Sequence, residues 1–322
     1  ISKTLANRPI RYQYKSDRIE FLDHALLGRH SLADTDIAKL NDNLFIEWYK
    51  DVIANNVNER KVLILQDGIL KYMTVPICYD HGASFIAGCK SDGFLETNMK
   101  KYCGEKFQSF RFDDFSDFIE SSDVNFDFLI ANFVDSAGLL LEGSIEQFLL
   151  AKTTMSSRLD SKEIITLPSS VRVFYRGYYN KELRFQRSID IDNTCGIDLS
   201  SINDYSVDIC SNVSLSRDEF VPVTEVNSSY NLLDISSAKI DENKTVKLKY
   251  LNGQRLMNCI GFWYEFGHCG STYLTFPTDP EEFTHFKQSV YMLKAEVPTT
   301  PGGRIELSLR GISKKIMHVI SV

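Results

Sequence analysis

The stretch KVLILQDGILKYM, residues 61–73, decides the fold more than any other part of the chain. A lysine leads into four apolar residues, a short polar turn follows, and the pattern after it is typical of the start of a helix. A buried strand that enters a helix through a tight turn is the unit that holds the cofactor in nucleotide-binding α/β domains. The turn contains one glycine, Gly68, where such loops usually carry three. The stretch therefore predicts the strand–turn–helix outline of a cofactor loop, and its single glycine leaves open whether the loop still holds a ligand.

Strand and helix patterns alternate from residue 61 to about residue 167. The expected strands are KVLIL, ASFIAG, FQSFRF and FDFLIAN, and helical patterns follow the first, the second and the fourth. This alternation is typical of a mainly parallel, Rossmann-like sheet with crossover helices. Residues 17–54, before the first strand, have apolar positions at helical spacing, so we expect a helical segment there.

The character of the sequence changes at Pro168, after which short apolar or alternating runs replace the helical patterns. Val246, Leu248 and Tyr250 alternate with lysines, as expected of a half-exposed strand. Such runs, separated by turn-rich connections, predict an antiparallel barrel or sandwich. We therefore expect three regions, an N-terminal helical segment at 1–55, an α/β domain at 56–168 and a β-barrel domain at 169–322.

Composition excludes several classes of protein. The net charge of −7 argues against direct nucleic-acid binding, which relies on a basic surface. No apolar run is long enough to predict a membrane span. The seven cysteines are scattered and no signal peptide precedes them, so we expect a reducing, cytoplasmic compartment. Two cysteine and histidine pairs could be considered as metal ligands, Cys78 with His81 and His268 with Cys269. Their spacing matches no paired zinc pattern, so we expect no metal site.

Four stretches, THFKQSVYML, CGIDLSSINDYS, LPSSVRVFY and FDFLIANFVDSAGLLLEGSIEQFLLAK, together resemble the protein arginine methyltransferases. THFKQSVYML at 284–293 resembles the threonine–histidine–tryptophan loop of that family, and CGIDLSSINDYS at 195–206 resembles its dimerisation-arm region. LPSSVRVFY at 167–175 resembles the crossing into the barrel, and residues 126–152 resemble the strand and loop that carry two catalytic glutamates. The resemblance covers about residues 30–322. It implies a Rossmann-like domain that binds S-adenosylmethionine, followed by an antiparallel β-barrel with a dimerisation arm.

The residues that the resemblance assigns to the cofactor differ from those of the family. The three glycine positions of the motif loop fall on Gln66, Gly68 and Leu70, and only a glycine permits close backbone approach to a ligand. The glutamate that accepts hydrogen bonds from the ribose falls on Lys90, whose side chain has donors only. We therefore expect that this chain binds no cofactor and that S-adenosylmethionine belongs to a catalytic partner.

The catalytic positions are also incomplete. The first family glutamate falls on Asn132, and the second corresponds to Glu142 in a loop that is one residue longer. Glu142 is either a remnant of catalysis or a first-turn helix residue favoured by the helix dipole. His285 remains, with Phe286 in place of the tryptophan, and we expect it to be a structural hydrogen-bonding residue rather than a catalytic one. No catalytic set is intact.

The segment at about 180–213 is expected to be a dimerisation arm. It is richer in apolar residues than a solvated loop needs, notably Leu183, Phe185, Ile197, Leu199 and Ile202. An exposed apolar patch of this kind usually marks an interaction site. The alternative is that these side chains fill barrel strands.

The resemblance then implies an inactive regulatory subunit, a prozyme, that stabilises or activates a catalytic arginine methyltransferase acting on arginine-rich proteins. A degenerate half of a tandem methyltransferase is a close variant. Two alternatives stay open: an active, divergent S-adenosylmethionine-dependent arginine methyltransferase, and a module that binds arginine-rich peptides without chemistry.

Overall fold

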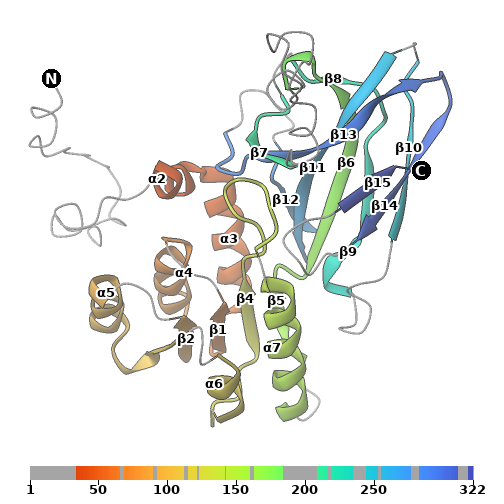
Figure 1. Ribbon diagram of the computed structural model, residues 1–322. Coiled ribbons are helices and arrows are strands. Elements are labelled where there is room, and N and C mark those ends of the chain that lie inside the picture. The colour runs from red at the N-terminus through yellow and green to blue at the C-terminus, as the bar shows by residue number, and fades with distance from the viewer. Residues whose placement is uncertain are drawn as a thin grey trace, which may run out of the picture.

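A computed structural model describes the chain in thirteen ranges, 34–65, 69–89, 93–111, 115–121, 123–141, 143–159, 163–183, 209–216, 219–234, 244–252, 255–276, 283–310 and 318–321. An α/β domain occupies one end of the molecule and an antiparallel β domain the other (Figure 1). The chain passes from the first to the second at Pro168, where the sequence predicted the change.

The α/β domain is built on a parallel sheet with the strand order β3-β2-β1-β4-β5. Its strands are β1 (Lys61–Leu65), β2 (Phe85–Cys89), β3 (Phe107–Phe110), β4 (Phe128–Ala131) and β5 (Ile165–Leu167). β4 is buried along its whole length, and β1 is buried at its three central residues. Near-continuous apolar strands are expected where helices cover both faces of a sheet. The four strands predicted from the sequence are confirmed.

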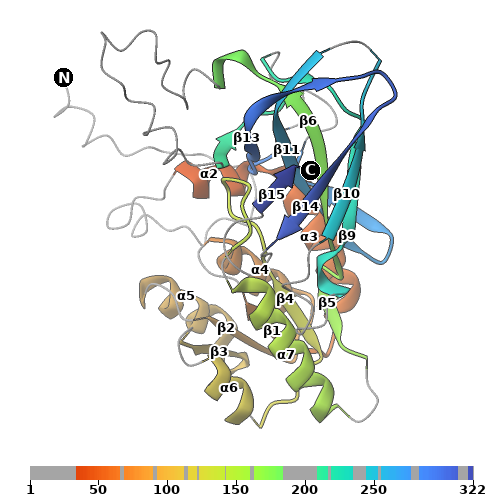
Figure 2. The ribbon, with the colours of Figure 1, turned by 45° about the vertical axis from the view of Figure 1, so that its right-hand side comes forward.

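Two groups of helices cover this sheet. α3 (Asn43–Asn56), α4 (Ile69–Asp80) and α5 (Gly93–Cys103) pack in sequence, and α6 (Phe115–Ser121) packs on α7 (Ser144–Arg158) (Figure 2). Right-handed crossovers place the connections before and after the reversal of strand order on opposite faces. The sequence did not predict α6, since seven residues give too short a periodic pattern.

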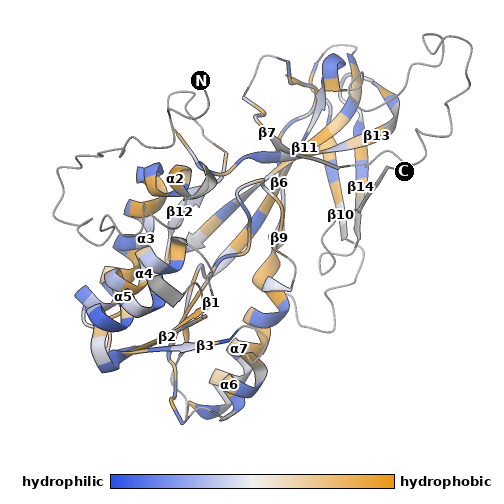
Figure 3. Cartoon of the chain, turned by 60° about the vertical axis from the view of Figure 1, so that its left-hand side comes forward, coloured by the Kyte–Doolittle hydropathy of each residue, from blue (hydrophilic) through white to orange (hydrophobic). Residues whose placement is uncertain are grey.

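The helices are amphipathic, as packing on one side requires. Figure 3 shows apolar and polar residues side by side along each of them. On α3 the buried positions are spaced three and four residues apart, namely Phe45, Trp48, Tyr49, Val52 and Ile53. α2 (Asp34–Asn41) precedes α3 and is separated from it by Asp42 alone. None of the helices in the described ranges is both long and apolar enough to cross a membrane.

The β domain is an antiparallel, curled arrangement of two sheets. The larger has the order β7-β13-β11-β6-β8, with β12 added to β11 and β9 to β6, and the smaller has the order β10-β14-β15. The strand bounds are β6 (Ser170–Tyr179), β7 (Ile209–Val213), β8 (Val221–Pro222), β9 (Asn227–Asn231), β10 (Lys244–Lys249), β11 (Arg255–His268), β12 (Ser271–Leu274), β13 (Gln288–Thr299), β14 (Arg304–Arg310) and β15 (His318–Ser321). Val246 and Leu248 are buried and alternate with the exposed residues Thr245, Lys247 and Lys249, which confirms the predicted half-exposed strand.

Candidate functional site

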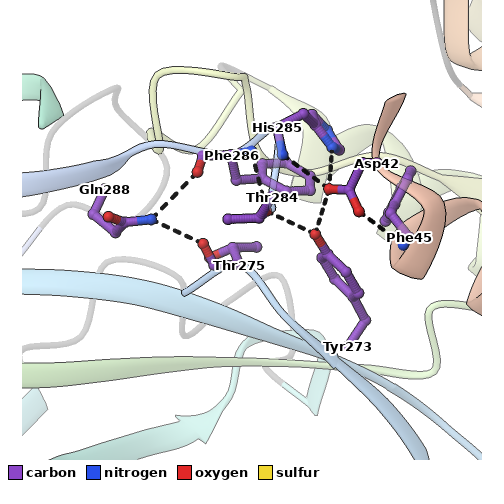
Figure 4. A network of polar contacts seen from close by, with 8 residues as sticks. All are labelled: Asp42, Phe45, Tyr273, Thr275, Thr284, His285, Phe286 and Gln288. Atoms are coloured by element: carbon purple, nitrogen blue, oxygen red, sulfur yellow. Dashed lines mark hydrogen bonds and ion pairs between the residues drawn. The ribbon is translucent and has the colours of Figure 1, made fainter. Parts of the chain in front are cut away.

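The two domains meet where the N-terminus of α3, the carboxyl end of β4 and the loop before β13 come together. Asp42 lies at the centre of this junction and is fully buried. Its Oδ1 accepts a hydrogen bond from the Phe45 backbone N–H at 3.0 Å and so caps α3. Its Oδ2 accepts from the Tyr273 hydroxyl at 2.7 Å, the His285 backbone N–H at 2.9 Å and His285 Nδ1 at 2.8 Å (Figure 4). One carboxylate therefore fixes α3 to the β domain.

Burial and hydrogen bonding together determine the protonation states of Asp42 and His285. Burial alone would raise the pKa of Asp42, but the hydrogen bonds from His285, Tyr273 and the Phe45 backbone outweigh it and hold the pKa below its ordinary value. Burial lowers the pKa of His285, and the bond to Asp42 only partly opposes this. The pair is thus a carboxylate and a neutral imidazole, with the Nδ1 proton assigned by this hydrogen bond. His285 is thus hydrogen-bonded to Asp42 in the junction, and whether its role is structural or catalytic stays a prediction.

Sequence reasoning missed Asp42. The signal available was a polar run, Asn41 to Asn43, before an apolar helical pattern, which is typical of a helix N-cap. That signal predicts a cap but contains no information about His285, which lies 243 residues further along the chain.

Aromatic rings fill the junction around Asp42. The Phe45 ring lies 4.8 to 6.3 Å, centroid to centroid, from five others, those of Trp48, Tyr49, Tyr273, His285 and Phe286. The hollow between α3 and the carboxyl end of β4 is lined by Phe45, Trp48, Tyr49, Ala131, Asn132, Phe133, Pro168 and Phe266. It has no room for a water molecule. A substrate side chain could enter between these residues only if rings moved apart.

Asn132 follows β4 directly, where the resemblance places the first glutamate. Its amide Nδ2 donates to the Val134 carbonyl oxygen at 3.0 Å, so the side chain is engaged by its own loop. The loop folds back on itself, because the Leu141 N–H donates to the Phe133 carbonyl oxygen at 2.8 Å. Glu142 lies outside the described residues. Asn132, the catalytic position that the structure does describe, has an uncharged amide side chain, which cannot neutralise a guanidinium group.

The loop after β4 is fixed against the loop that carries His285. The Lys287 N–H donates to the Ser136 carbonyl oxygen at 2.9 Å, and the Ser289 hydroxyl donates to the Ala137 carbonyl oxygen at 3.1 Å. Gly138 has a φ of +82°, and a Cβ there would lie 2.3 Å from the Lys287 carbonyl oxygen. Only glycine therefore allows this close approach of the two loops.

At the expected cofactor loop, β1 ends at Leu65 and α4 begins at Ile69. Gln66, Gly68 and Lys90 lie outside the described residues. Leu70, where the resemblance places the third glycine of the loop, is the second residue of α4. Its side chain is 3% exposed and packs in the core of the α/β domain.

Lys71, the next residue of α4, is completely buried at the carboxyl end of β2. Its Nζ donates to the Cys89 carbonyl oxygen and lies 3.6 Å from Glu96 Oε2. Ligands of open α/β sheets bind outside the carboxyl ends of the strands. The Lys71 ammonium group therefore lies at the edge of the sheet where such ligands bind.

The expected arm is described only at its two ends, and both belong to the β domain. Leu183 is 5% exposed and packs with Tyr178 and Leu215, and its N–H donates to Asn180 Oδ1 at 2.8 Å. At the other end β7 pairs with β13. Leu183 therefore fills the barrel core, as the alternative reading of these apolar residues held. Four further residues lie outside the described ranges, namely Phe185, Ile197, Leu199 and Ile202.

In the part of the chain that the structure describes, no three His, Cys, Asp or Glu residues are grouped so that they could hold a metal ion. Of the residues considered for this role, Cys78 is buried in the α/β core and His268 Nδ1 is 2.9 Å from the Thr166 carbonyl oxygen. Cys78 therefore packs in the core, and His268 contacts the backbone.

Comparison with solved structures identifies the class of fold. A chain described as the Trypanosoma brucei PRMT1 enzyme-prozyme heterotetrameric complex with AdoHcy matches with a TM-score of 0.66 and 17% identity, over 85% of this chain and 86% of the other. Protein arginine methyltransferase 10 of Arabidopsis thaliana matches with a TM-score of 0.62 and 13% identity, over 88% and 95%. A structure of PRMT6 with SAH matches with a TM-score of 0.59 and 13% identity, over 89% and 98%.

The chain therefore has the fold of the protein arginine methyltransferases, a Rossmann-like domain followed by an antiparallel β domain. No family model and no curated protein matches its sequence. At identities this low, the likeness establishes the fold and leaves the activity to be argued from the site.

Proposed function

We propose that this chain is a catalytically inactive, arginine methyltransferase-like subunit that assembles with a catalytic arginine methyltransferase and stabilises or activates it. The observation that carries the proposal is Asn132 at the end of β4, with its amide bonded to the Val134 carbonyl oxygen beside a hollow filled by aromatic rings. A methyl acceptor site needs the opposite, an open cleft with carboxylates.

The physical reason is the charge of the substrate. A guanidinium group is a planar fork of five donors that carboxylates hold in two parallel hydrogen bonds. Removing such a cation from water without carboxylates that neutralise it costs several kcal/mol. Asn132 offers one acceptor and no charge, and it lines the same hollow as Phe45 and Trp48.

Support for the partner comes from the comparison. One of the matching structures is described as an enzyme-prozyme complex, and the match extends over most of both chains. A chain that keeps the fold but has lost the clamp can still contribute a surface to an active paralogue. Arginine-rich substrates would then be methylated by that paralogue, with this chain acting through the complex in the cytoplasm.

The test is a methylation assay on an arginine-rich peptide with this chain alone, the catalytic arginine methyltransferase of the same organism alone, and the two co-expressed. We expect no turnover by this chain and higher turnover by the pair than by the paralogue alone. Turnover by this chain, with contaminating enzyme excluded, would overturn the proposal.

Asn132→Glu is a matched variant for this assay. It restores one carboxylate but leaves the rings of the junction and the buried Lys71 in place, so we expect no turnover from the variant alone. Robust methylation would mean that the cofactor still binds and that only the clamp was missing.

One observation favours an active, divergent methyltransferase as the second candidate. The neutral imidazole of His285, oriented by Asp42, is of the kind that general-base catalysis uses. Calorimetric titration of the isolated chain with S-adenosylmethionine separates the two candidates. Micromolar binding supports the enzyme, and absence of heat supports the regulatory subunit.

A further inference from the structure

Lys71 is held in an unusual place for a lysine. Its side chain is completely buried, and its stem passes over Gly88 of β2, where a Cβ would lie 3.2 Å from Lys71 Cδ. Its Nζ donates to the Cys89 carbonyl oxygen and lies 5.1 Å from the centroid of the Tyr72 ring. The glycine makes room for the stem, and the ammonium group reaches the carboxyl end of the strand.

Glu96, in the first turn of α5, is the counter-charge. The residue is 4% exposed, and within the described part of the chain its carboxylate oxygens have no hydrogen bond. Their charged contact is the Lys71 ammonium group, 3.6 Å from Oε2. An isolated buried charge is strongly unfavourable, so neither group can leave without destabilising the other. The pair therefore holds the cation in place between α4, α5 and the end of β2.

The position of this pair in the sheet gives it a second consequence. Open parallel α/β sheets bind ligands outside the carboxyl ends of their strands, beside the point where the strand order reverses. Here the order reverses around β1, which lies between β2 and β4. Lys71 thus occupies the edge of the region in which such a sheet would hold a nucleoside.

We propose that Lys71 is an internal occupant of the ligand crevice, a cation supplied by the chain itself, which closes the crevice beside β2 to a nucleoside ligand. The Glu96 carboxylate keeps it there. This inference deepens the proposed function and rests on it, because it states what closes the cofactor site of an inactive subunit.

The test measures thermal unfolding of the full chain during a titration with S-adenosylhomocysteine. We expect no shift of the unfolding midpoint for the wild type. Lys71→Ala combined with Glu96→Gln removes the occupant without leaving a bare carboxylate, and its midpoint should rise by several degrees with the ligand. Lys101→Ala, which changes an exposed lysine of α5, is the control and should show no ligand response. A ligand-dependent rise in the wild type, or none in the double variant, overturns the proposal.

A measurement on the native chain covers the case in which the double variant does not fold. Reductive methylation with formaldehyde, followed by mass spectrometry, reports the accessibility of each lysine. Lys71 should stay unmodified while Lys100 and Lys101, both exposed, react. Modification of Lys71 at the rate of these two lysines would show that the ammonium group is not held in the crevice.

The two proposals can fail separately. If the wild type binds S-adenosylhomocysteine but still assembles with a catalytic paralogue and raises its turnover, Lys71 is not the occupant and the regulatory role stands. If the wild type does not bind S-adenosylhomocysteine and forms no complex with a paralogue, the proposal for Lys71 is supported and the proposed regulatory role is wrong.

Discussion

Asp42 shows how much of this molecule depends on one side chain. Its Oδ2 accepts from three donors of the β domain, and its Oδ1 caps α3. Hydrogen bonds to a charged acceptor contribute about 1.5–3 kcal/mol, and a helix cap about 1 kcal/mol. The residue therefore contributes to the stability of the helix and to the attachment of one domain to the other.

Asp42→Ala should lower the free energy of unfolding by about 3 kcal/mol, because it removes the cap and leaves the Tyr273 hydroxyl and the His285 ring without their acceptor. Asp51→Ala is the matched control, since Asp51 lies on the same helix and is exposed. Urea denaturation measures both. Equal effects of the two substitutions would contradict the role given to Asp42.

The Asp42–His285 pair also predicts how stability depends on pH. Both pKa values are lower in the folded chain than in the unfolded one. In each case the unfolded state binds more protons as the pH falls, so acid destabilises the fold. The contribution of His285 is lost from about pH 6.5 downward, and that of Asp42 from about pH 3.9 downward, where the unfolded groups titrate.

His285→Asn keeps a donor near the position of Nδ1 but does not titrate. Its unfolding free energy should therefore fall less steeply than that of the wild type just below pH 6.5, the ordinary pKa of histidine. Chemical denaturation across this range measures the difference. Parallel curves for variant and wild type would show that His285 takes up its proton equally well in both states.

At the scale of the elements, the loop after β4 contacts the β domain through its own backbone groups, the carbonyl oxygens of Ser136 and Ala137. Gly138 allows these contacts, because its positive φ and its missing Cβ bring the loop against the Lys287 carbonyl oxygen. Gly104 also has a positive φ, of +60°, but a Cβ there would meet nothing within 4 Å. An alanine at Gly104 would therefore meet only the cost of the positive φ. An alanine at Gly138 would meet that cost and a steric clash with Lys287 as well.

Gly104→Ala should cost about 1 kcal/mol of stability, the penalty of a left-handed conformation for alanine. Gly138→Ala should cost more, about 3 kcal/mol, since the loop must also move away from Lys287. Thermal unfolding of both variants checks the order. If Gly138→Ala were no worse than its control, the loop would not be tightly docked on the β domain.

The elements also show which predictions from the sequence are reliable. β1 and β4 were predicted at their observed places because burial of both faces produces continuous apolar runs. The start of a helix after the short polar turn was predicted as well, and α4 begins there at Ile69. The helix α6 was not predicted, because seven residues give too short a periodic pattern.

At the scale of the whole molecule, the proposed regulatory role requires a surface that a partner recognises. The sequence suggests the segment at about 180–213, whose described ends are anchored in the β domain. Leu183 packs inside that domain and is 5% exposed, so we propose no partner contact for it.

Replacing Ile197, Leu199 and Ile202 together with aspartate should release the partner and reduce its activity, because charged side chains are costly in an apolar interface. Size-exclusion chromatography of the co-expressed pair, beside a methylation assay, measures both effects. Val226→Asp is the control, as it changes an exposed apolar residue of the β domain. An intact, fully active complex after the triple change would show that the contact lies elsewhere.

The sequence by itself determined the order of the domains, the parallel sheet and the antiparallel β domain, because the period of apolar residues reflects which face of an element is buried. The family resemblance, and not the apolar period, placed Asn132 just after β4. The tertiary structure decided the rest: the bonds between Asp42 and His285, 243 residues apart, the filling of the junction by the Phe45 ring, and the burial of Lys71 against Glu96. Contacts between distant segments form only when the folded chain brings them together, and no local period encodes them.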